Sequence, residues 1–339
     1  MKIKSVNELH GGEHLAEPLL TKEKEMLLPK GAMIKEEYIS LLESAEIKSV
    51  SIEDPYRKYE HAHPIAEENH IQRLTELVQS LMEKHIYHDH KSLLGFEMIA
   101  NEMVKGLEEV DGQVYDLEER KSNLYEHTVY VTLLSMKAAM RLQLENVSLY
   151  EIALGCLLHD LGLRYTTVEY TDCEWNKKSP EEIFEIKKHT ILGYSALDEE
   201  GWIPEVSKKM VLAHHERRDG SGYPMKRKYR DQGCQLIQIC DSFDCMISGM
   251  ECKRTPVWSA LDELQQQSDI KYEKEYVETL VSMVARYPVG TKVKLNQGDI
   301  GIIIQQTTDS QKPIIMLEKD VKKKHNLKLE KDISILEII

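Results

Sequence analysis

The chain has 339 residues, of which 41% are hydrophobic, 30% are charged and 6% are aromatic, and its formal net charge is −14. This length allows about two domains with a buried core, and the composition is ordinary for a soluble, helix-rich protein. The large negative charge argues against general binding to duplex nucleic acid or to membrane surfaces. An anionic ligand would therefore have to be held locally, by metal ions or by a few arginines.

The first part of the chain, residues 1–58, is predicted to be a small α/β unit. Short strands are expected in LAEPLLT, MLLPKGAMI and IKSVSI. Residues 35–46 have helical spacing, with Tyr38, Leu41 and Leu42 on one face. A helical connector is predicted over residues 59–120, because the sequence is helical in character from about 67 to 117 and neither of its two long segments contains an interior proline.

The middle part, residues 121–286, is predicted to be almost entirely helical. Helices are expected over residues 122–142, 147–162, 179–197, 206–216 and 234–248. The third begins with a capping-box pattern, in which Ser179 is the N-cap, Pro180 the first helical residue and Glu182 the reciprocal partner.

The last part, residues 287–339, changes character and is predicted to be a small β module. The segments TKVKL, DIGIIIQQ, KPIIML and ISILEI are strand-like, and Asn296-Gln297-Gly298 supplies a turn. The fold class predicted for the whole chain is therefore mainly α, with a helical core between a small N-terminal α/β unit and a small C-terminal β module.

Histidines and aspartates occur next to apolar sequence on five of the predicted helices. A single buried histidine is usually a hydrogen-bonded core residue, but a set of such groups in one domain is harder to explain because buried charge is costly unless it is paired or binds metal. The set is His127, His159, Asp160, His189, His214, His215 and Asp241.

Adjacent side chains on a helix diverge by about 100°, so the doublets His159-Asp160 and His214-His215 do not easily bind one ion from one side. They can flank two ions, with a bridging carboxylate between them. Imidazole with carboxylate suits iron, manganese, zinc or nickel better than magnesium or calcium. The pattern predicts a dinuclear transition-metal site.

These motifs resemble those of the HD-GYP proteins, a subfamily of the HD-domain metal-dependent phosphohydrolases. His159-Asp160 matches the HD doublet, HHERRDGSGYP matches the stretch HHExxDGxGYP, and DSFD, beginning at Asp241, follows in the family order. The resemblance covers about residues 121–285 and implies an all-helical HD core. It also implies a centre of two or three metal ions, often iron or manganese, and hydrolysis of cyclic di-GMP to pGpG or GMP.

The resemblance also implies roles for particular residues. All seven residues of the set become metal ligands, with Asp160 as the bridge, and His159 and Asp160 become the catalytic pair. The turn after the paired histidines is expected to fold over the site. The expected substrate contacts are Gly222, Tyr223, Arg217 and Arg218.

Three departures from the family pattern affect these expectations. Leu163 occupies the position of the lysine in HDxGK, and Arg164, one residue later, is a possible substitute as a substrate contact. Asn123 occupies the position at which members with three metals have a glutamate, which favours two ions and makes a third doubtful. The segment after the HD doublet also lacks the usual GIP run.

Two alternatives therefore stay open: an HD phosphohydrolase acting on another cyclic or linear nucleotide, and a weakly catalytic module that senses a cyclic dinucleotide or docks a diguanylate cyclase-type protein. A homodimer is also possible. A cytoplasmic location is expected because no segment approaches the ~20 apolar residues of a membrane span. The first residues, MKIKSVNELHGGEH, contain no apolar core of a signal peptide. The six cysteines form no CxxC pair and are interpreted as reduced thiols rather than as disulfides.

Overall fold

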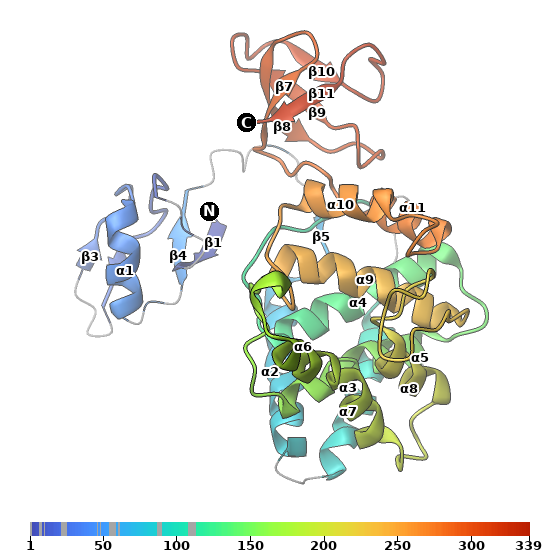
Figure 1. Cartoon of the computed structure of the whole chain (residues 1–339). Helices are drawn as coiled ribbons and strands as arrows, with labels where there is room; N and C mark the ends of the chain where they lie inside the picture. The colour runs from blue at the N-terminus through green and yellow to red at the C-terminus, as the bar shows by residue number, and fades with distance from the viewer. Residues whose placement is uncertain are drawn as a thin grey trace.

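The computed structural model describes residues 2–6, 9, 11–21, 26–45, 47, 49–53, 59, 62–86, 90–107 and 113–339. Figure 1 shows a central helical body, with the N-terminal unit in blue to its left and the C-terminal β module in red above it. Each of the three has its own cluster of buried apolar side chains. The predicted mainly α fold, with a small α/β unit and a small β module, is confirmed.

The N-terminal unit contains two small antiparallel pairings and a helix. Strand β1 (Lys2–Ser5) pairs with β4 (Ser49–Ile52), and β2 (Leu19–Leu20) pairs with β3 (Met26–Leu28). Helix α1 (Glu36–Ser44) packs over them through buried Leu42. Strands β2, β3 and β4 and the helix lie in the predicted segments, whereas β1 is a strand that sequence reasoning missed.

The helical body forms one continuous core that also includes the connector. Its cluster of buried side chains runs from Ile65 to Val284, so the connector helices share a core with residues 121–286. The predicted boundaries near residues 58, 120 and 286 stay predictions. The helices of the body are α2 (Glu68–Ile86), α3 (Leu93–Gly106), α4 (Leu124–Leu142), α5 (Leu149–Leu158), α6 (Pro180–Lys187), α7 (His189–Leu197), α8 (Glu205–Ala213), α9 (Gln232–Ser248), α10 (Val257–Gln266) and α11 (Lys274–Met283).

Helix α4 lies at the centre of this body and contacts α2, α5 and α9. Short 3₁₀ turns, η2 (His90–Ser92), η3 (Leu161–Tyr165) and η4 (Trp175–Lys177), lie between the helices. The connector was expected to be helical as far as residue 117, but α3 ends at Gly106, and β6 (Tyr115–Asp116) pairs in parallel with β5 (His63–Pro64). This pairing ties the beginning and the end of the connector together.

Local sequence signals explain where two of these helices begin. Ser148 and Glu151 form a capping box at α5, and Ser179 and Glu182 form the predicted one at α6. The prediction of one helix over residues 179–197 is wrong, because the chain breaks at Lys188 into α6 and α7.

A histidine side chain occupies the point at which α6 and α7 separate. Nδ1 of His189 lies 2.7 Å from the carbonyl oxygen of Ile186, so the imidazole donates a hydrogen bond to the last turn of α6. The start of α7 is also held close to η3, since a Cβ added at Gly162 would lie 1.9 Å from the carbonyl oxygen of His189. The HD doublet and His189 are thereby fixed next to each other.

The C-terminal module is an antiparallel sheet with strand order β10-β9-β8-β7-β11. Alternating residues, such as Val293, Leu295 and Ile315, are buried on one face, as the period-two pattern predicts. Strand β10 was not among the predicted strands. The strands are β7 (Lys292–Leu295), β8 (Ile300–Gln305), β9 (Ile314–Leu317), β10 (Lys324–Asn326) and β11 (Ile335–Ile338).

Candidate metal centre

The structure brings all seven candidate ligands together inside the helical body. They come from α4, the end of α5, the start of α7, the end of α8 and the middle of α9, and none is more than 7% exposed. Within the described residues they form two groups, and the ligand atoms of each group lie within 4.8 Å of one another. One group is Asp160, His189, His214 and His215, and the other is His127, His159 and Asp241.

Asp160 lies between the two groups and divides its oxygens between them. Its Oδ1 lies 3.4 Å from Nε2 of both His189 and His214. Its Oδ2 lies 3.3 Å from Nε2 of His159 and 3.6 Å from Nε2 of His127. This is the arrangement expected of a carboxylate that bridges two cations.

Three of the histidines are oriented by the same local contact. Nδ1 of His159 lies 2.7 Å from the carbonyl oxygen of Cys156, and Nδ1 of His214 lies 2.8 Å from that of Val211, as His189 does with Ile186. A carbonyl oxygen only accepts hydrogen bonds, so Nδ1 donates and Nε2 faces the cluster. Metal-ligating histidines in proteins are commonly held in this way.

His127 is oriented by residues for which sequence reasoning assigned no role. Its Nδ1 lies 2.7 Å from Oδ2 of Asp244, the second aspartate of DSFD. Asp244 in turn accepts hydrogen bonds of 2.7 and 2.9 Å from Nη2 of Arg120. Both partners are buried, so this ion pair fixes the ring of His127 from behind. The DxxD spacing was the available signal for Asp244, whereas no local motif indicated Arg120.

The electrostatic environment differs between the two groups of histidines. Burial lowers the pKa of His189 and of His215 to about 4, which keeps these imidazoles in the neutral form that binds metal. Burial alone would also lower the pKa of His127, but hydrogen bonds to Asp241 and Asp244 raise it to about 9. In the metal-free chain His127 therefore holds a proton at neutral pH, and a metal ion would have to displace it.

The residues present fit a pair of divalent ions. Buried polar atoms normally have a hydrogen-bond partner, yet in the described part of the chain none reaches Asp160 Oδ1, Asp241 Oδ2 or His215 Nε2. A cation supplies what these atoms lack, and a donor set of imidazole nitrogens and carboxylate oxygens is the one that transition metals prefer.

A cavity of about 520 Å³ opens beside the cluster. Its walls include the candidate ligands His215 and Asp241, and also Arg217, Gly222 and Tyr223, which were predicted to contact substrate. Arg217 is held by a 2.8 Å hydrogen bond from its Nη2 to Ser242 Oγ. Further lining residues that sequence reasoning did not identify are Lys187, Trp175, Glu251, Lys271 and Tyr272.

Two other predicted substrate contacts point elsewhere. Arg218 pairs with Asp269 and Glu273, and Nη2 of Arg164 lies 2.9 Å from Oε2 of Glu83 on α2. Neither arginine is among the residues that line this cavity. Leu163 is 1% exposed and belongs to the core. Proximity to a motif in sequence does not fix the direction of a long side chain.

The turn after the paired histidines folds back over the cluster. The ring of Tyr223 stacks on that of His215, with centroids 4.6 Å apart and an interplanar angle of 23°. Its backbone N–H donates to the carbonyl oxygen of His215 at 3.1 Å. The carboxylate of Glu216 accepts hydrogen bonds from the backbone N–H groups of Met225 and Arg227, which fixes the far side of the turn.

The close approach of this turn requires glycine at position 222. A Cβ there would lie 2.3 Å from the carbonyl oxygen of His215, so Gly222→Ala must displace the turn. We expect the substitution to destabilise the protein by about 1–3 kcal/mol, the usual cost of overpacking. Thermal unfolding measures this. Met225→Ala changes an exposed side chain of the same turn and should stay within about 0.5 kcal/mol of wild type; equal stability of both variants would contradict the close packing.

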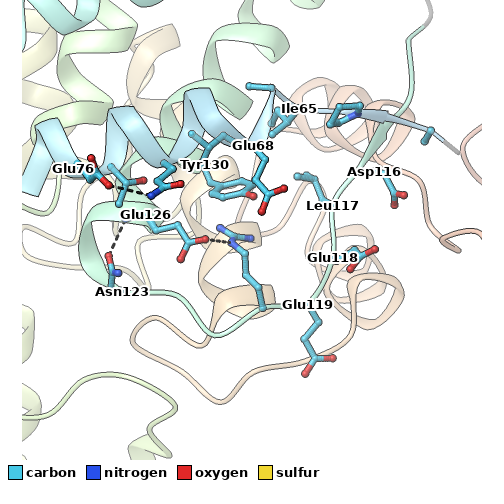
Figure 2. A pocket seen from close by; sticks show the side chains of 17 residues that line it. Ile65, Glu68, Glu76, Asp116, Leu117, Glu118, Glu119, Asn123, Glu126 and Tyr130 are labelled. Atoms are coloured by element: carbon cyan, nitrogen blue, oxygen red, sulfur yellow. Dashed lines mark hydrogen bonds and ion pairs between the residues drawn. The ribbon is translucent and has the colours of Figure 1, made fainter. Parts of the chain in front are cut away.

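A second, acidic cavity of about 690 Å³ lies between α2, residues 116–120 and the first half of α4, and contains none of the candidate ligands. Figure 2 shows Glu68, Glu76 and Glu126 around it, with Asn123 at its edge. The side-chain oxygen of Asn123 accepts hydrogen bonds of 3.0 Å from the backbone N–H groups of Tyr125 and Glu126, so Asn123 caps α4. The residue at the position of the third-metal glutamate thus has a structural role here.

Comparison with known proteins places this centre in a domain class. Residues 114–276 match the HD domain family. The chain therefore carries an HD domain, a class of divalent-metal-binding domain, and within that class its HHERRDGSGYP motif is of the HD-GYP type.

Two curated relatives match the same part of the chain. The chain is 29% identical over 202 residues to "Cyclic di-GMP phosphodiesterase" of Thermotoga maritima, covering 57% of this chain and 55% of the relative. It is 26% identical over 186 residues to "Cyclic di-GMP phosphodiesterase PA4108" of Pseudomonas aeruginosa, covering 54% of this chain and 44% of the relative. The chain thus spans about half the length of these curated relatives.

A solved structure described as "Bd1817, a HDG"Y"P protein from Bdellovibrio bacteriovorus" aligns with a TM-score of 0.49 at 16% identity, covering 82% of this chain and 97% of that chain. Among the described residues, no helix combines the length and the apolar character needed to cross a membrane.

Proposed function

We propose that this protein is a metal-dependent phosphodiesterase that hydrolyses cyclic di-GMP to pGpG, GMP or both. The observation that carries the proposal is the division of the two oxygens of Asp160 between two groups of buried histidines. The two relatives described above are cyclic di-GMP phosphodiesterases, which supports the proposed substrate class.

Two transition-metal ions, iron or manganese, are the proposed cofactors. His127, His159 and Asp241 would hold one ion and His189, His214 and His215 the other, with Asp160 shared. The position of Asn123 at the cap of α4 supports two ions rather than three. The chemistry that such ions supply is Lewis-acid activation of water and of phosphate oxygens.

The remaining steps are assigned to side chains of this chain. Asp160 and His159 are the proposed catalytic pair, and Asp160 Oδ2 lies 3.3 Å from His159 Nε2. Arg217 and Lys187 line the cavity and would neutralise phosphate charge in a chain that is otherwise acidic. The rings of Tyr223, Trp175 and Tyr272 offer surfaces on which purine bases stack.

Lys187 takes the place of the lysine that is missing at position 163. It lies in α6, and its Nζ lies 5.1 Å from the ring centroid of Tyr223 and 5.6 Å from that of Trp175, both of which also line the cavity. Buried Leu163 cannot contact a phosphate. Lys187 therefore supplies positive charge from a different element of the fold.

Lys187→Ala should lower kcat/KM for cyclic di-GMP about 10–100-fold, because a charge-assisted hydrogen bond of about 1.5–3 kcal/mol is lost. Steady-state kinetics on metal-loaded protein measures the effect. The matched control is Lys188→Ala: Lys188 pairs with Glu185 and is not among the lining residues of the cavity. If the two variants had the same kcat/KM, Lys187 would have no role in phosphate binding.

The proposal is tested with a panel of nucleotides. Protein purified without oxygen is loaded with Mn or Fe, incubated with cyclic dinucleotides and with linear nucleotides, and the products are separated by HPLC. Loss of cyclic di-GMP with formation of pGpG or GMP is the expected result. Consumption of linear nucleotides alone would overturn it, and so would binding of cyclic di-GMP without product by the metal-loaded protein.

The burial of Leu163 is the observation that favours the second candidate, an HD phosphohydrolase for another nucleotide or a sensor that binds without turnover. Docking to diguanylate cyclase-type proteins, homodimer formation, the remaining substrate contacts predicted at Arg164 and Arg218, and a cytoplasmic location stay predictions from sequence.

A further inference from the structure

Glu251 lies in the turn after α9, and its side chain contacts two of the candidate ligands, His189 and His215. The residue is 5% exposed. Its backbone has φ +54°, in the left-handed region that a residue with a side chain seldom adopts. Its carbonyl oxygen accepts a hydrogen bond of 3.2 Å from Sγ of Cys173. Such a conformation persists only when the surroundings hold it, and it is often found at functional sites.

The Glu251 carboxylate accepts one long hydrogen bond, of 3.4 Å from the Tyr223 hydroxyl to Oε2, and its other close approaches are to two imidazoles. Its Oε2 lies 2.9 Å from His215 Nε2, and its Oε1 lies 3.4 Å from His189 Nδ1. His189 Nδ1 already donates to the carbonyl oxygen of Ile186. The approach to His215 Nε2 does not have hydrogen-bond geometry, and within the described residues Glu251 Oε1 has no hydrogen-bond partner either.

A shared cation explains this approach. Imidazole and carboxylate ligands lie about 2.0–2.2 Å from a bound transition metal, so two neighbouring ligands of one ion lie roughly 3 Å apart. The separation of 2.9 Å between His215 Nε2 and Glu251 Oε2 has this value. A buried carboxylate beside neutral imidazoles is also costly unless it is paired or binds metal.

We infer that Glu251 is an additional ligand of the ion proposed to be held by Asp160, His189, His214 and His215. This inference rests on the proposed metal centre and extends it. That ion then has two carboxylate and three histidine ligands, whereas the other has two histidines, Asp241 and its share of Asp160. The two sites are therefore unequal, and the Glu251 side has more protein ligands.

The test is a titration of metal-free protein with Co(II), followed by affinity and by the visible absorption spectrum, which reports the number of bound ligands. Glu251→Gln keeps the shape of the side chain and removes its charge. We expect it to weaken the binding of one of two ions at least tenfold and to change the spectrum. Glu263→Gln removes the same charge from the same cavity, away from the histidines, and should match wild type.

The other outcomes separate the inference from the proposed function. Unchanged affinity and spectrum in Glu251→Gln would overturn it. Weaker binding with an unchanged spectrum would also overturn it, because Glu251 would then only position His215 from outside the coordination shell. If wild-type protein bound no ion, the proposed metal centre itself would fail.

A second measurement does not depend on a variant that folds. In a crystal structure of the wild-type chain loaded with Co(II), an oxygen of Glu251 should lie about 2.0–2.2 Å from an ion. A carboxylate that stays beyond ligand distance from both ions would contradict the inference.

Discussion

Replacing Asp160 with alanine is expected to remove both bound ions and to lower the hydrolysis of cyclic di-GMP by at least ~10³-fold. Asp160 places Oδ2 near His159 of one group and Oδ1 near His189 of the other, so its carboxylate is the proposed bridge between the two ions. Metal ions in such sites supply several kcal/mol of transition-state stabilisation, and each ~1.4 kcal/mol corresponds to a factor of ten in rate. Metal content and turnover are measured on the same preparation.

The control for this experiment is Asp231→Ala. Asp231 is an aspartate of the same domain that lies 3.5 Å from Lys209 and does not contact the cluster. It should keep wild-type metal content and activity. An Asp160→Ala protein with normal metal loading and turnover would show that Asp160 is not a bridge.

Asp244→Asn is expected to weaken metal binding about 10–100-fold and to destabilise the metal-free protein by about 3–5 kcal/mol. The first effect arises because Asp244 orients His127, and partners of metal ligands commonly contribute this much to affinity. The second arises because buried Arg120 loses its closest counter-charge and keeps only Glu126, 3.8 Å from its Nε. Metal titration measures the first effect and thermal or urea unfolding the second.

A matched control replaces the aspartate of a more exposed ion pair. Asp262 pairs with Arg286, and its side chain is 39% exposed, so Asp262→Asn should cost at most about 1 kcal/mol and leave metal binding unchanged. If Asp244→Asn behaved like this control, the orientation of His127 would not depend on the buried pair.

The candidate ligands could be predicted from sequence because each carries a local signal. His159-Asp160 and His214-His215 follow apolar helices, and Asp241 follows the apolar run LIQIC, so each had to point inward. Glu251 has no such signal. It reaches the cluster because its backbone adopts a left-handed conformation in the turn between α9 and α10. From sequence alone, a charged residue in a loop is expected to be exposed to solvent.

Long-range partners account for most of what sequence reasoning missed at the site. Arg120 and Asp244 are 124 positions apart, and their pairing depends on how α4 and α9 pack. Lys187 lines the cavity as the last residue of α6, beside a break in the helix that helical periodicity alone does not reveal. The same break made the prediction of one helix over residues 179–197 wrong.

The central claim of this account is that two ions lie on either side of Asp160. It is tested most directly by element-specific mass spectrometry of the wild-type chain purified without oxygen. We predict two equivalents of transition metal, iron or manganese, per chain. A chain that is catalytically active with no bound metal, or with one equivalent at saturation, would contradict the claim.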